Sequence, residues 1–154
     1  MKEKLKLRGE FTIEIKDKDG KLKDKRVVKN TITNAGIAEV ANLIGGVSTP
    51  TAFTYLALGI GTTAAAITDT ILESEITDTG LARHAATMSR VTTNVTNDTT
   101  QLAYTWTATG VKVVTECGVL NAASVGTLLG RQVFGAISTV STDQIAVTYK
   151  IIVS

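Results

Sequence analysis

Residues 4–16 alternate between apolar and charged or polar side chains, and no other stretch of the chain constrains the fold as strongly. The apolar positions are Leu5, Leu7, Gly9, Phe11, Ile13 and Ile15. Because successive side chains of a β-strand point to opposite faces, a period of two predicts a strand with one buried and one charged face. Asp19-Gly20 predicts a hairpin turn after this strand. The return strand is expected from residue 21 to about residue 33.

This hairpin carries most of the positive charge. Residues 1–30 hold 11 of the 16 Lys and Arg residues and 6 of the 14 acids, a balance of +5, whereas the rest of the chain stands at −3. One interpretation places the hairpin at a sheet edge, where lysines discourage stray pairing. The other makes residues 1–29 an arm that packs on a neighbouring subunit. The candidate contact residues in this segment are Lys4, Lys6, Arg8, Lys16, Lys23 and Arg26. Nucleic acid is not the expected partner, because acids interleave with the bases and no aromatic platform accompanies them.

The composition of the remaining chain favours strands. The chain has 26 threonines and one proline, and β-branched side chains suit a pleated, half-buried surface. Strands are expected at residues 82–95, 99–109, 111–120, 128–137 and 144–153. Residues 53–63 are expected to form a buried strand, in which Gly59 and Gly61 indicate a bulge or a close backbone approach. We predict a mainly β, single-domain sandwich or jelly roll over residues 1–154, with seven or eight strands.

One helix is expected at about residues 34–44. Thr33 or Asn34 can cap its first turn, and Gly45-Gly46 ends it. Its apolar positions recur at i, i+3, i+4 and i+7, and they are Ile37, Val40, Ala41 and Ile44. A helix this short does not persist alone, so this apolar face is expected to lie on the sheet.

Residues 62–79 form a small, polar and acidic stretch without clear periodicity. Long irregular segments of this kind often serve contacts. We expect an irregular surface segment that becomes ordered when a partner covers it. Its Glu73, Glu75 and Asp78 are candidate contacts that complement the basic hairpin of another subunit.

The sequence contains no recognisable catalytic constellation. His84 is the only histidine and Cys117 the only cysteine, and neither has a local partner for nucleophilic chemistry or a metal. Gly59-Ile-Gly61 lacks the lysine of a phosphate-binding loop. We therefore predict a protein that is not an enzyme and holds no cofactor or metal. Without an apolar signal region or a run of roughly 18 apolar residues, it is expected to be made without export and not to enter a membrane.

Four motifs carry a resemblance to a known class of proteins. They are Asn30-Thr-Ile-Thr-Asn-Ala-Gly36, Tyr55-Leu-Ala-Leu-Gly-Ile-Gly-Thr-Thr63, Glu116-Cys-Gly-Val-Leu-Asn-Ala122 and Ile145-Ala-Val-Thr-Tyr-Lys-Ile151. Their order resembles small virion proteins of tailed bacteriophages, in which a Leu-Ala-Leu-Gly-x-Gly-Thr strand precedes a Glu-x-Gly-Leu-Phe-Asn-Ala strand. The resemblance spans roughly residues 30–152, and Val119-Leu120 departs from the usual Leu-Phe.

The resemblance implies a structural component of a virus particle, most like a head decoration (cement) protein. Such a protein is expected in the virion as a homotrimer that clamps neighbouring copies of the major capsid protein or another virion protein. No functional residues carry over, because the shared motifs resemble core and turn positions. A minor tail or fibre-associated protein is the first alternative. A carbohydrate- or surface-binding module is the second.

Overall fold

The alternating N-terminal segment forms an inner strand of the first of two antiparallel sheets. In the computed structural model, which describes residues 4–154, β1 (Leu7–Lys16) pairs with β10 (Gln144–Val153) on one side and β2 (Leu22–Lys29) on the other. The strand order is β2-β1-β10-β7-β6, with β7 at Thr99–Thr107 and β6 at Thr87–Val91. The hairpin therefore occupies a sheet edge, through β2. Residues 1–3 of the predicted arm lie outside the described residues.

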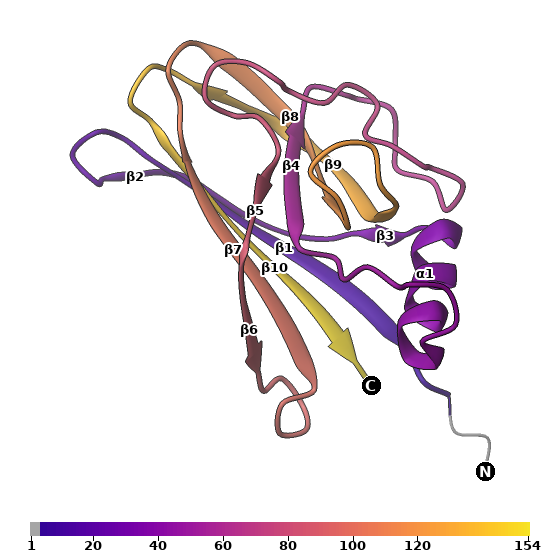
Figure 1. Cartoon of the computed structure of the whole chain (residues 1–154). Helices are drawn as coiled ribbons and strands as arrows, with labels where there is room; N and C mark the ends of the chain where they lie inside the picture. Colours follow the sequence, from indigo (N-terminus) through magenta and orange to yellow (C-terminus); the bar gives the residue numbers. More distant parts are fainter. Residues whose placement is uncertain (1–3) are drawn as a thin grey trace.

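The second sheet faces the first and completes a sandwich (Figure 1). Its strand order is β3-β9-β8-β4-β5. The strands are β3 (Thr31–Ile32), β9 (Leu128–Thr139), β8 (Lys112–Leu120), β4 (Tyr55–Gly59) and β5 (His84–Ala85). The prediction of a mainly β sandwich with one helix is confirmed.

Residues 4–154 hold ten strands, rather than seven or eight, because two predicted strands change sheets. The return strand of the hairpin divides at Asn30, so β2 lies in the first sheet and β3 in the second. The segment 82–95 divides at Ala86, so β5 and β6 also lie in different sheets. Periodicity along the sequence cannot show such a crossing, because each half still reads as an extended segment.

The core fills the space between the two sheets. Its fully buried side chains include Phe11, Ile13 and Ile15 from β1, together with Leu56, Leu58, Leu102, Ile145 and Tyr149. The rings of Phe11 and Tyr149 are 4.4 Å apart between centroids. Full burial of one such aliphatic or aromatic side chain contributes about 1.5–3 kcal/mol. The apolar face predicted from the alternation of β1 is thus the face that holds the sandwich together.

The helix α1 (Asn34–Gly45) begins and ends as predicted, but it packs through a different face. Thr33 caps it, with its side chain accepting the N–H of Gly36, and Gly46 ends it in the left-handed region at φ 62°. Gly36 lies against the backbone of Leu129 in β9, where there is no room for a Cβ. Val40 and Leu43 follow on the same side and pack against the core.

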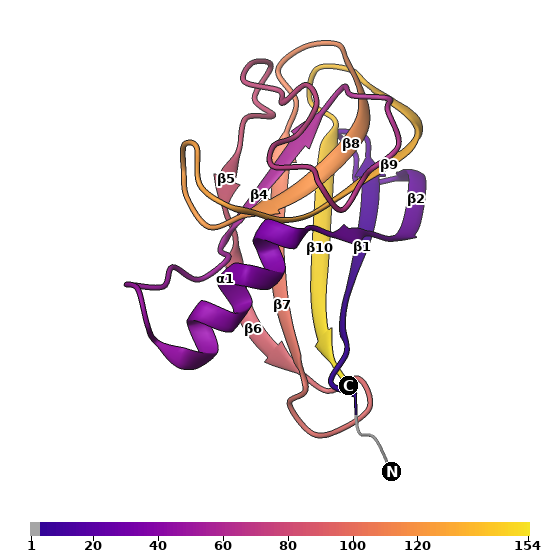
Figure 2. The ribbon, with the colours of Figure 1, turned by 90° about the vertical axis from the view of Figure 1, so that its right-hand side faces the viewer.

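The predicted contact face of α1 is therefore wrong in three of its four positions. Ile37 is 54% exposed and Ile44 75% exposed, and Ala41 is exposed as well. The close approach of Gly36 to Leu129 determines which side of the helix packs, and the later turns extend past the ends of β8 and β9 (Figure 2). An apolar helix face is left uncovered in the described part of the chain.

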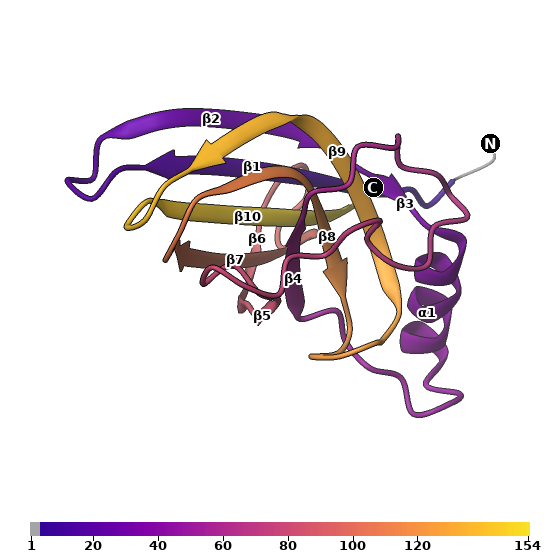
Figure 3. The same cartoon turned by 90° about the horizontal axis from the view of Figure 1, so that it is seen from above.

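Residues 60–81 cross the outer face of the second sheet (Figure 3). Leu72 is buried against Ala57, Leu120 and Leu128 on that face. Backbone hydrogen bonds join Ile60 N–H to Ser74 C=O at 2.8 Å and Ile76 N–H to Leu58 C=O at 2.9 Å. The expectation that a partner orders this segment is therefore wrong, because contacts with the second sheet of the same chain hold it in place.

Candidate functional site

A buried ionic cluster holds the 60–81 segment in place. Glu116 projects from the outer face of β8, and Arg131 does so from β9. Arg131 Nε lies 2.6 Å from Glu116 Oε2, its Nη1 2.8 Å from Asp69 Oδ2 and its Nη2 3.2 Å from Glu73 Oε2. Burial raises the pKa of Asp69, but the Ala66 N–H and the Arg131 guanidinium outweigh it and hold that pKa below its ordinary value. All three guanidinium nitrogens of Arg131 are therefore paired within the chain, and the role of this cluster is structural.

The sequence carries one sign of this cluster. Glu116 and Arg131 are charged residues inside apolar strands, and a charge buried in a strand is normally paired. Glu116 also accepts the N–H groups of Gly61 at 3.0 Å and Ser74 at 2.8 Å. The close approach predicted at Gly59 and Gly61 is confirmed, since a Cβ at either position would collide with the Glu116 carboxylate.

The three acidic candidate contacts are each bound within the chain. Glu73 accepts from Thr63 and from Arg131. Glu75 forms a two-point pair with Arg83, at 2.8 and 2.6 Å, and Asp78 pairs with Lys112 at 2.6 Å. Their proposed role opposite another subunit's hairpin stays a prediction, and it would compete with these internal partners.

The basic candidates separate into two groups along the hairpin. Lys16, Lys23 and Arg26 belong to the end nearer the turn, where Lys23 pairs with the buried Asp143 at 2.5 Å and Arg26 pairs with Asp24 at 3.0 Å. Lys4, Lys6 and Arg8 belong to the opposite end, at the start of β1, and all three are exposed. The structure therefore does not bring the six together into one patch.

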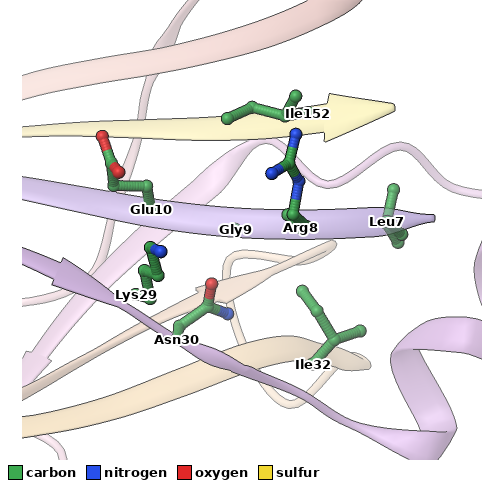
Figure 4. A pocket seen from close by; sticks show the side chains of 8 residues that line it. All are labelled: Leu7, Arg8, Gly9, Glu10, Lys29, Asn30, Ile32 and Ile152. Atoms are coloured by element: carbon green, nitrogen blue, oxygen red, sulfur yellow. The ribbon is translucent and has the colours of Figure 1, made fainter. Parts of the chain in front are cut away.

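A groove lies between the start of β1 and the helix, next to the second group. It consists of two adjoining hollows of about 330 and 360 Å³ that share Leu7 and Ile32. We call it the α1–β1 groove. Its apolar part is formed by Leu5, Leu7, Ile32, Ile37, Val40 and Ile44. Its polar part is formed by Arg8, Glu10, Lys29 and Asn30 (Figure 4).

The uncovered side chains of the helix give the groove its apolar wall. Ile37 and Ile44 face it from α1, and Leu5, which is 76% exposed, faces it from the other side. Glu39, the only charged residue of α1, points elsewhere and accepts the N–H of Thr51 at 2.9 Å. Large exposed apolar patches with a polar rim mark interaction sites in soluble proteins. The α1–β1 groove is therefore the strongest candidate site on the described surface.

A tight contact at Asn30 fixes the floor of the groove. The Asn30 side chain lies between Gly9 and Gly130, and neither position leaves room for a Cβ beside it. The buried Tyr149 hydroxyl donates to Asn30 Oδ1 at 3.3 Å, and burial raises the pKa of Tyr149. This contact holds the chain at the point where it leaves β2 for β3, and so it shapes the gap beside β1.

The residues that sequence analysis examined for chemistry lie elsewhere. His84 is exposed and stacks on Tyr104, with ring centroids 3.8 Å apart. Cys117 is buried in the core, and burial raises the pKa of its thiol. Within residues 4–154, no group of three His, Cys, Asp or Glu side chains is placed to hold a metal ion. Over the same residues, no helix has the length and apolar character to cross a membrane.

No known protein-family model matches the chain, and no curated protein matches it in sequence.

Proposed function

We propose that this protein is a binding component of a larger assembly, and that it attaches through the α1–β1 groove. The observation that carries the proposal is the apolar helix face that the sandwich leaves uncovered, with Ile37 54% and Ile44 75% exposed. Transfer of such apolar surface from water into an interface is favourable by about 25 cal/mol for each Å², and the affinity is what remains after the entropic cost of association is subtracted.

We propose further that the assembly is a bacteriophage capsid, which the protein decorates and stabilises. Two of the motifs that resemble virion proteins lie side by side as β4 and β8. They also meet at one carboxylate, because Glu116 of the second motif accepts the N–H of Gly61 in the first. This contact supports the interpretation of the two motifs as a single structural unit.

In the proposed mechanism, many identical copies of this protein each bury surface against a neighbouring virion protein. A homotrimer would present three grooves, each able to hold a neighbouring copy of the major capsid protein or another virion protein. Specific interfaces bury about 1,600 Å² in total, and several joined contacts raise the overall affinity above that of one. The protein would then reside in the virion and act by bridging subunits, with no chemical step.

Two measurements test this proposal. In electron micrographs of virus particles with gold-labelled protein, label on the heads is expected, whereas label on the tails would favour a minor tail component. Light scattering of the purified protein should give three times the chain mass of 16.2 kDa. Particles without label, or a strictly monomeric protein in solution and on particles, would contradict capsid decoration by a trimer.

A further inference from the structure

The strand β1 has an open edge beside the α1–β1 groove. Lys6 exchanges two backbone hydrogen bonds with Ser154 in line with β10, at 2.6 and 3.0 Å. Val153 is opposite Leu7, but it donates its N–H to the C=O of Asp98 at 3.1 Å, on the side of β10 that faces away from β1. Because bonded and non-bonded pairs alternate along an antiparallel ladder, Leu7 directs its N–H and C=O away from β10.

No strand occupies the other side of Leu7 in the described part of the chain. The pairing of β1 with β2 ends at Glu10 and Lys29, and Asn30 then donates its N–H to Gly9 C=O at 3.1 Å. From there the chain leaves for the second sheet, where β3 pairs with β9. The position that β2 would occupy beside Leu7 is vacant, and the α1–β1 groove is the space that remains.

The two faces of this position differ in chemistry. On the inner face, an added strand would place its side chains against Ile32, Ile37 and Val40. On the outer face it would lie beside Lys6 and Arg8, and among residues 4–154 no carboxylate forms an ion pair with either. Inward apolar and outward acidic side chains are therefore the complementary pattern.

We propose that β1 accepts an extended acidic segment of a partner protein as an added antiparallel strand, in the position that β2 vacates at Asn30. Main-chain hydrogen bonds to an exposed sheet edge provide affinity in such strand additions, and alternate side-chain positions provide specificity. This inference names the partner chemistry of the α1–β1 groove, and it rests on that groove being the binding surface proposed above.

The charge of the first sheet's free edges argues against edge-to-edge pairing with the same sheet of a second copy. The free edge strand β2 is rich in lysine, and the free edge strand β6 carries Arg90 and no carboxylate. Either strand would bring more positive charge beside Lys6 and Arg8. Like charges placed together at an interface cost free energy and suppress that pairing.

The test uses the full chain and an eight-residue peptide of alternating valine and glutamate as the probe. We expect saturable binding and slower hydrogen exchange of the Leu7 amide when the peptide is present. A peptide of alternating valine and lysine should bind at least about tenfold more weakly. Arg8→Glu and Ile37→Asp should each weaken binding by a similar factor, because they reverse the outer charge and remove the inner apolar wall.

N-methylated peptides make the test specific for strand addition. In an antiparallel pair, a residue opposite Leu7 shares its face, so the inward valines carry the N–H groups that face β1. Methylating the valine nitrogens should abolish binding, and methylating the glutamate nitrogens should leave it unchanged. The exposed Val111→Asp and Lys18→Glu variants are matched controls outside the groove and should bind as the wild type does.

Three outcomes would overturn the inference. They are the absence of binding by the valine–glutamate peptide, equal loss of binding with both methylated peptides, and self-association of the protein through residues 5–9. Peptide binding without attachment to virus particles would leave the inference standing and contradict the proposed function. Attachment to particles without peptide binding would contradict the inference and leave the proposed function standing.

Discussion

Arg131 Nε lies 2.6 Å from Oε2 of Glu116 on the outer face of the second sheet, and both side chains are buried. The pair joins β8 to β9 and also anchors the segment that covers them, through Asp69 and Glu73. Removing one partner of a buried pair leaves a charge without compensation. The cluster is thus the point at which the outer layer of the fold is most sensitive to substitution.

The first prediction concerns this pair. Arg131→Met should lower the free energy of unfolding by about 3–5 kcal/mol, because it leaves the buried Glu116 carboxylate without a counter-charge. Urea unfolding measures the change. Lys18→Met, which breaks an exposed pair with Asp19, is the control and should change stability by at most about 1 kcal/mol. A loss of unfolding free energy no larger than that of the control would show that Arg131 does not compensate the buried charge of Glu116.

The second prediction concerns the glycine beside that carboxylate. A Cβ at Gly59 would lie 2.4 Å from Glu116 Oε1, so Gly59→Ala should destabilise the protein by about 1–3 kcal/mol through overpacking. Gly45→Ala is the control, since its Cβ would meet only a methyl group of Val47 at 3.2 Å at the end of α1. Thermal unfolding that places Gly59→Ala at or above the control would contradict the close approach.

The third prediction concerns the cap of the helix. The buried Thr33 hydroxyl accepts the Gly36 N–H at 2.9 Å and donates to Leu128 C=O at 2.5 Å. Thr33→Ala should therefore cost about 1–2 kcal/mol. Thr33→Ser keeps both hydrogen bonds and should lose clearly less in the same denaturant titration. Equal losses for the two variants would assign the effect to the methyl group.

The fourth prediction concerns stability in acid. Burial raises the pKa of Asp143, but the Lys23 ammonium and the Val140 N–H outweigh it and hold that pKa below the ordinary value of 3.8. Below that value the unfolded chain therefore binds more protons than the folded protein. The contribution of Asp143 is present above about pH 4 and is lost as pH falls through the lowered folded pKa.

Urea unfolding at pH 6 and pH 3 measures this dependence. Asp143→Asn should lower stability at pH 6 and reduce the difference between the two pH values. Asp19→Asn, at an exposed turn position, should leave the difference unchanged. If Asp143→Asn retains the full pH dependence of the wild type, the pair with Lys23 does not contribute to acid sensitivity.

Local periodicity was sufficient to predict the elements whose pattern reports burial directly. The alternation of residues 144–153 matches β10, and the capping pattern around Thr33 and Gly46 matches the ends of α1. The crossings at Asn30 and Ala86 were not predicted, because a change of sheet leaves the local pattern unbroken.

The candidate site was predicted only in part, for a similar reason. Lys6 and Arg8 were identified from the charge of the first strand, and both border the groove. The groove itself depends on where β2 leaves the sheet and on the close packing of Gly36 against Leu129. Both are tertiary contacts between distant residues, and the same packing determines why Ile37 and Ile44 remain exposed.

The most direct measurement of the central claim is co-sedimentation of the purified protein with virus particles that lack it. We expect the wild type and the Val111→Asp control to sediment with the particles in a fixed ratio to the capsid protein. The double variant Ile37→Asp/Ile44→Asp should stay in solution, because it removes the apolar wall of the α1–β1 groove without touching the core. Sedimentation of the double variant at the wild-type ratio, or failure of the wild type to sediment at all, would contradict the claim.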